Sequence, residues 1–213
     1  MNTVEIDTPT GPARAYVHPA DAPRAALVLG HGAGGGVEAP DLVATTEAAV
    51  PEGFTVALVE QPYRVAGRKS PAPAKRLDEA WIAVVEHLTP NELSGLPVIV
   101  GGRSVGARVA CRCLPETGGL AVLCLAFPLQ PPARKGKEPS PDRLPELEAV
   151  DAPVLVVQGD RDQFGMPPPG PTRQVAKVPG ANHSLRSDPD AVGDAVRSWL
   201  VDVVKESAGA PTR

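Results

Sequence analysis

Apolar, β-branched runs alternate along this chain with segments of helical periodicity. Between and after these runs, apolar side chains recur every three or four positions, most clearly over residues 75–88, a spacing that predicts helices. Continuous apolar strands joined by helices imply a mostly parallel sheet that is buried on both faces. We therefore expect an α/β fold with helices on both faces of the sheet. The five apolar runs lie at residues 25–29, 54–59, 97–100, 120–127 and 153–158.

The remaining segments extend this pattern at both ends of the chain. Residues 4–6 and 13–16 could add antiparallel edge strands, and residues 174–178 could form a short late strand. The last helix is expected to start with Asp188 as its N-cap and Pro189 at the first helical position. A chain of 213 residues fits one α/β domain better than two, so we expect a single domain over residues 1–213.

Composition excludes several classes of partner. The net charge is −4 and the basic residues are scattered, so the sequence predicts no nucleic-acid-binding surface. The longest apolar stretch, residues 120–127, is too short to span a bilayer, and we expect no membrane association. The first residues lack the basic region and apolar core of a secretory signal, which favours a cytoplasmic location.

The cysteines fit the same compartment. Their number, three, is odd, and Cys111 and Cys113 lie two positions apart in a predicted helix, so their side chains point in different directions. Cys124 lies inside a predicted strand and is not expected to supply a partner for a disulfide or a metal. We therefore expect buried free thiols and no metal site.

The segment directly after the third apolar run carries the strongest functional signal. Residues 101–108 read GGRSVGAR, so Ser104 stands in a Gly-x-Ser-x-Gly pattern between a strand and a predicted helix, as in a nucleophile elbow. Small residues are needed at Gly102 and Gly106, because a Cβ atom there would collide with adjoining backbone. The helix is expected to begin near Val105, whose N–H would face an oxyanion formed at the serine.

A glycine-rich loop, residues 30–36 with the sequence GHGAGGG, allows two interpretations. Its glycines match the G-x-G-x-x-G fingerprint of a dinucleotide site, and Glu60 ends the next strand, where a ribose-binding acid would lie. However, residues 36–40 delay the helix that should receive the pyrophosphate. The loop is therefore better explained as an oxyanion loop, with the N–H of Ala33 as the preferred donor.

A serine hydrolase of this type also needs an acid and a histidine later in the chain. Asp160 and Asp162 follow the fifth apolar run, and Asp162 is favoured because a residue or two beyond the strand lets its side chain turn back. Asp160 is expected to cap a turn. The sequence alone leaves Asp160 as the alternative acid. His183, the only late histidine, precedes the last helix and is the expected base.

These motifs together resemble the α/β-hydrolase superfamily. The chain looks most similar to its small cap-less branch, which includes testis-expressed and NSL-complex-type α/β-hydrolase-like proteins and lies near the dienelactone hydrolases. The resemblance implies an α/β-hydrolase fold without a lid domain and a triad of Ser104, Asp162 and His183. The resembling segments are residues 29–35, 61–64, 101–108, 158–165 and 182–185.

Two departures from the superfamily pattern affect the expected activity and the support of the acid. Dienelactone hydrolases proper use a cysteine nucleophile, so Ser104 argues against that specific activity. Residues 163–172 are too rich in proline for the helix that the superfamily usually has there. Residues 130–145 are likewise too short and proline-rich for a helical lid, so we expect an open, shallow site.

The sequence therefore predicts a serine hydrolase that cleaves small carboxylic esters or thioesters through an acyl-enzyme, with Val105 and Ala33 N–H groups as the oxyanion hole and no cofactor. A non-catalytic α/β-hydrolase-like scaffold is the main alternative, and a dinucleotide-binding protein is a further one. Exposed Arg103 and Arg64 could attract an anionic substrate. The sequence gives no indication of the oligomeric state.

Overall fold

The computed structural model describes residues 1–131 and 140–209 of the chain. Eight strands form one sheet in the order β1-β2-β4-β3-β5-β6-β7-β8. Strand β1 pairs antiparallel with β2, β2 pairs antiparallel with β4, and all the other pairs are parallel. The sheet is therefore mostly parallel, as predicted. The strands are β1 (Asn2–Ile6), β2 (Ala13–His18), β3 (Ala25–Gly30), β4 (Phe54–Glu60), β5 (Val98–Arg103), β6 (Val122–Leu125), β7 (Val154–Gly159) and β8 (Arg173–Val178).

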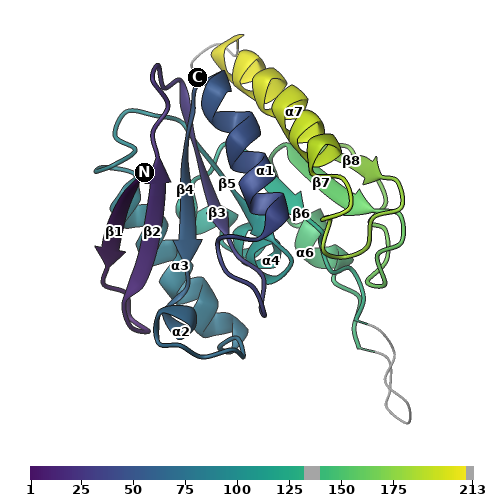
Figure 1. The fold of residues 1–213 in the computed structure, drawn as a ribbon, viewed down its shortest axis with the longest axis horizontal. Helices are drawn as coiled ribbons and strands as arrows, with labels where there is room; N and C mark the ends of the chain where they lie inside the picture. The colour runs from purple at the N-terminus through teal and green to yellow at the C-terminus, as the bar shows by residue number, and fades with distance from the viewer. Residues whose placement is uncertain (132–139, 210–213) are drawn as a thin grey trace.

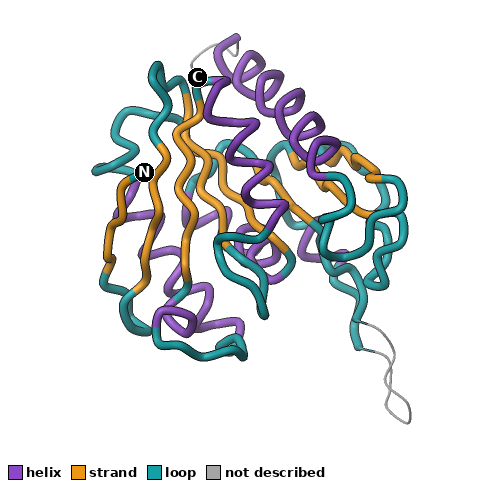
Figure 2. The backbone as a smooth tube through the Cα atoms, viewed as in Figure 1, coloured by secondary structure: helices purple, strands orange, loops and turns teal. Residues whose placement is uncertain are grey.

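Helices cover both faces of this sheet (Figure 1). Helices α1 (Pro40–Ala49) and α7 (Pro189–Gly209) pack together on one face, and α3 (Ala74–Leu88) and α4 (Val105–Arg112) lie on the other (Figures 1 and 2). The shorter elements are η1 (Val50–Glu52), α2 (Pro62–Val65), α5 (Leu114–Thr117) and α6 (Leu144–Glu148). This arrangement confirms the predicted α/β fold.

Two hydrophobic clusters, one on each face of the sheet, form the core. The apolar stripe of α3, including Trp81, is fully buried against the first cluster. The stripe of α7, including Trp199, packs with α1 and with Phe54 of β4 in the second cluster. Burial of these stripes is what holds the helices on the sheet, because apolar area removed from water contributes roughly 25 cal/mol per Å².

Several local predictions are confirmed. Helix α7 begins at Pro189, and Asp188 Oδ1 accepts a hydrogen bond of 3.0 Å from the N–H of Ala191, the geometry of an N-cap. Residues 163–172 form turns and loop without a helix. No lid-like domain is present in the described part of the chain. Of the segment 130–145, residues 132–139 lie outside the described residues.

The cysteines are free, and two of them lie side by side. All three are buried and free, as predicted, but Cys124 does have a thiol neighbour: its Sγ lies 3.6 Å from Cys111 Sγ. Helix α4 packs directly on β6, and this packing brings together two positions that local periodicity could not relate. Of the helices within residues 1–131 and 140–209, none is long and apolar enough to cross a membrane.

Candidate active site

Ser104 occupies a strained turn between β5 and α4. Its backbone has φ 53° and ψ −107°, a combination that an L-residue rarely adopts and that costs about 1–3 kcal/mol. The turn is held in place because the N–H of Ser104 donates a hydrogen bond of 2.9 Å to the carbonyl of Leu125, at the end of β6. The sharp turn lifts the serine side chain out of the sheet, as in a nucleophile elbow.

The two glycines of the elbow are required by close backbone contacts. A Cβ atom at Gly102 would lie 2.5 Å from the carbonyl oxygen of Gly30, and one at Gly106 would collide with the same oxygen. Both contacts are with backbone, which cannot move aside like a flexible side chain. The expected collision is therefore confirmed, and its partner is the end of β3, where the glycine-rich loop starts.

His183 lies between the nucleophile candidate and a carboxylate. Its Nδ1 is 2.8 Å from Asp162 Oδ2, and its Nε2 is 2.9 Å from Ser104 Oγ. A carboxylate only accepts hydrogen bonds, so Nδ1 carries the proton and Nε2 is free to accept the hydroxyl proton of the serine. The structure thus brings the three predicted side chains into one hydrogen-bonded series.

Asp162 is held by three donors. Besides His183, it accepts hydrogen bonds from the backbone N–H of Phe164 at 2.9 Å and from the side-chain amide of Gln158 at 2.8 Å. Its side chain is fully buried, so these bonds replace the water it would otherwise bind. Asp160 is exposed and accepts a hydrogen bond from the N–H of Gly180, which is the turn-capping role expected of it.

The glycine-rich loop is fixed by residues that sequence reasoning assigned no role in the site. The N–H of Gln61 donates to His31 Nε2 at 3.1 Å, so His31 is neutral and its Nδ1–H donates to the carbonyl of Gly32 at 2.8 Å. Burial lowers the pKa of His31, which favours this neutral form. Tyr63 OH donates to the carbonyl of Ala33 at 3.0 Å. Gln61 and Tyr63 lie in residues 61–64, one of the segments that resemble the superfamily, and this resemblance was the only sequence signal that pointed to them.

The two predicted oxyanion donors belong to separate elements. Val105 is the first residue of α4, so its N–H has no intrahelical acceptor. Ala33 lies in the loop after β3, and within the described residues its N–H donates to no protein acceptor. Helix α1 begins only at Pro40, so no helix N-terminus lies within the glycine fingerprint, and the geometry that pyrophosphate binding needs is absent from this described segment.

Arg103 differs from the expectation of an exposed charge. Its side chain is only 15% exposed, and its Nε lies 2.9 Å from Asp41 Oδ2 in an ion pair. Its Nη2 donates a hydrogen bond of 3.0 Å to the carbonyl of His183. Sequence could not show this, because Asp41 is 62 positions away along the chain and its carboxylate is fully buried.

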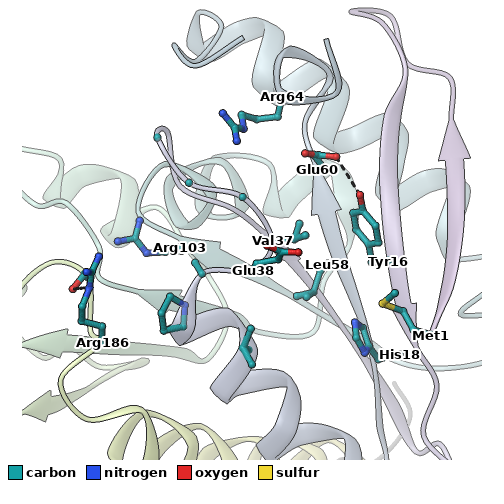
Figure 3. Close-up of a pocket in the computed structure, with 17 residues that line it drawn as sticks. Met1, Tyr16, His18, Val37, Glu38, Leu58, Glu60, Arg64, Arg103 and Arg186 are labelled. Atoms are coloured by element: carbon teal, nitrogen blue, oxygen red, sulfur yellow. Dashed lines mark hydrogen bonds between the residues drawn. The ribbon is translucent and has the colours of Figure 1, made fainter. Parts of the chain in front are cut away.

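Two cavities meet at Arg103 and Ser184. The smaller, of about 370 Å³, is also lined by His183 and Arg161. The larger, of about 790 Å³, extends along the glycine-rich loop. In Figure 3, Arg103 and Arg186 lie at one end of it, Met1, Tyr16 and His18 lie at the other, and Glu38 lies between them. Its charged lining mixes arginines 64, 103 and 186 with glutamates 38 and 60.

Comparison with solved structures shows the same fold in several hydrolases. A lid-less α/β serine hydrolase from Xanthomonas campestris is 18% identical, with 93% of this chain and 94% of that chain covered and a TM-score of 0.71. Est1E from Butyrivibrio proteoclasticus is 15% identical, with 96% and 100% covered and a TM-score of 0.76. A dienelactone hydrolase from Anabaena variabilis is 17% identical, with 94% and 96% covered and a TM-score of 0.72.

Sequence comparison assigns the family. No match was found among curated proteins. A family model described as an alpha/beta hydrolase domain matches residues 23–203, which runs from just before β3 into the last helix and includes every element that positions Ser104, His183 and Asp162. Because this match covers most of its length, the chain belongs to the α/β-hydrolase family.

Proposed function

We propose that this protein is a serine hydrolase that cleaves small carboxylic esters or thioesters through a Ser104–His183–Asp162 triad. The observation that carries the proposal is the hydrogen-bonded series of these three side chains, at 2.9 Å and 2.8 Å, on a strained elbow. Such a series is what converts a weakly nucleophilic hydroxyl into an effective one.

Each residue then has a defined step. Ser104 Oγ attacks the carbonyl carbon while its proton moves to His183 Nε2, and Asp162 stabilises the resulting imidazolium. The N–H groups of Val105 and Ala33 stabilise the oxyanion of the tetrahedral intermediate. When the intermediate collapses, the alcohol or thiol leaves with the proton from His183. Water, deprotonated by the same imidazole, then hydrolyses the acyl-enzyme.

Small acyl groups are favoured by the surroundings of the serine. The described residues contain no lid-like domain that could cover a long acyl chain. Two structural neighbours have been solved with small carboxylic acids: Est1E with ferulic acid, and an esterase from Thermogutta terrifontis with malate. These ligands belong to those proteins, and they support testing short and aromatic acyl esters first.

Covalent labelling of Ser104 tests the proposal. A fluorophosphonate should label the folded protein once, and Ser104→Ala should abolish both labelling and hydrolysis of p-nitrophenyl acetate or a thioester panel. Labelling that persists unchanged in Ser104→Ala would overturn the assignment. A protein that neither reacts nor hydrolyses any ester, but retains a partner protein, would instead support the scaffold function.

A further inference from the structure

Arg103 contacts three parts of the site that are distant from one another in the sequence. It is the last residue of β5 and directly precedes Ser104. Its guanidinium lies 2.9 Å from a carboxylate oxygen of Asp41, in the first turn of α1, and donates a hydrogen bond of 3.0 Å to the carbonyl of His183. One side chain thus ties together the elbow, the helix that follows the glycine-rich loop, and the loop that carries the histidine.

Asp41 provides a buried counter-charge for this guanidinium. The Asp41 carboxylate is fully buried. Burial raises its pKa, and the positive charge of Arg103 acts in the opposite direction. Burying an ion pair is expensive, and replacing one by apolar residues is often neutral or stabilising. A buried pair at this position therefore suggests a role beyond fold stability.

The glycine-rich loop leaves room for the guanidinium. A Cβ atom at Gly32 would lie 2.5 Å from Arg103 Nη1 and 3.5 Å from Ser104 Cβ. Its closest contact would thus be the end of the arginine side chain and not backbone. The absence of a side chain at Gly32 therefore leaves space for the Arg103 side chain to pass beside Ser104.

Arg103 supplies the hydrogen bond at His183 itself, in a loop whose flanks are held by other groups. The N–H of Arg161 bonds to the carbonyl of Ala181 on one side, and Leu185 is buried in the second hydrophobic cluster on the other. Among the described residues, Arg103 is the only side chain that bonds to the backbone of His183. The imidazole itself contacts Asp162, Ser104 and the Phe164 ring.

We propose that Arg103 is a positioning residue, which, anchored by Asp41, holds the backbone of His183 so that its imidazole meets Ser104 and Asp162 together. The proposal deepens the hydrolase function and rests on it for its kinetic test. A planar guanidinium can contact a carboxylate and a carbonyl at the same time, which an ammonium group cannot do with the same geometry.

The test replaces Arg103 with alanine and then adds guanidinium to the solution in place of the missing side chain. With p-nitrophenyl acetate, Arg103→Ala should lower kcat about 100-fold and change KM less than about twofold, since small misplacements of catalytic groups cost this much. Millimolar guanidinium should restore kcat at least about tenfold, whereas tetramethylammonium, a cation without N–H donors, should not. Arg112→Ala is the matched control, because Arg112 is also a mostly buried arginine, with its side chain 22% exposed, and pairs with Asp78 outside the site.

A second measurement separates this inference from the hydrolase function. The downfield proton NMR signal of His183 Nδ1–H reports its bond to Asp162 in the full chain, whether or not any ester is turned over. It should be present in wild type and Ser104→Ala, lost in Arg103→Ala, and recovered with guanidinium. A folded Arg103→Ala that keeps this signal, keeps kcat, or loses kcat without guanidinium rescue overturns the inference. An inactive wild type with an Arg103-dependent signal overturns only the hydrolase function.

Discussion

The side-chain amide of Gln158 donates a 2.8 Å hydrogen bond to Asp162 Oδ2, the same oxygen that faces His183 Nδ1. Gln158 is fully buried near the end of β7, and its two amide N–H groups are shared between Asp162 and the carbonyls of Phe127 and Gly165, which lie 3.1 Å and 2.9 Å from Nε2. A neutral donor in this position holds the carboxylate without competing with it for a proton. The acid of the proposed triad is therefore aimed by the strand that precedes it.

Asp162→Asn should lower kcat of p-nitrophenyl acetate hydrolysis by about 10³-fold or more, because an amide can donate to His183 and so favour the wrong tautomer. Asp160→Asn is the matched control: it keeps an acceptor for the N–H of Gly180 and should retain activity within about twofold. Steady-state kinetics of both variants decide which carboxylate is the acid. Comparable losses in the two would contradict the assignment to Asp162.

Gly106→Ala should destabilise the protein by about 3 kcal/mol, since the new methyl group would collide with the backbone of Gly30. Neither α4 nor the end of β3 can shift without disturbing the packing around it. Gly35→Ala is the control, because a Cβ atom there meets nothing within 4 Å, and its stability should change by less than about 0.5 kcal/mol. Urea unfolding measures both. Equal stability of the two variants would show that the elbow tolerates a side chain.

His31 should make stability depend on pH in the mildly acidic range. Burial lowers its pKa below 6.5 in the folded protein, so its contribution to stability is present above pH 6.5 and is lost as the pH falls through the folded pKa. Protonation would remove the acceptor for the N–H of Gln61. The stability difference between wild type and His31→Gln should therefore shrink between about pH 7 and pH 5, as measured by urea unfolding. A difference that is constant over this range would contradict the neutral, bonded His31.

The three cysteines should resist thiol reagents in the folded protein. Burial raises the pKa of Cys113 to about 12, and the hydrogen bond with Cys111 together with burial raises that of Cys124, so little thiolate is present at neutral pH. Ellman's reagent should react negligibly under native conditions and with three equivalents after unfolding in guanidinium chloride. Rapid native labelling of any cysteine would show that these positions open to solvent.

Local sequence patterns were sufficient to predict the main strands and helices and the order of the site residues along the chain. Period and turn residues predicted the parallel sheet, the helix stripes and the N-cap at Asp188, because these depend on near neighbours in sequence. The Gly-x-Ser-x-Gly pattern predicted a turn in which Gly102 and Gly106 must be small. The order of Ser104, Asp162 and His183 along the strands placed them at one edge of the sheet.

Tertiary packing decided the contacts that the sequence could not reveal. Arg103 was expected at the surface, but α1 brings the buried carboxylate of Asp41 against it and the final loop brings the carbonyl of His183. Cys124 is a free thiol as expected, but only the packing of α4 on β6 places it beside Cys111. Local periodicity tells which face a residue occupies, whereas a partner distant in sequence is selected by how the faces of separate elements meet. The sequence therefore determined which residues could form the site, and the packing of elements around the sheet decided what holds them there.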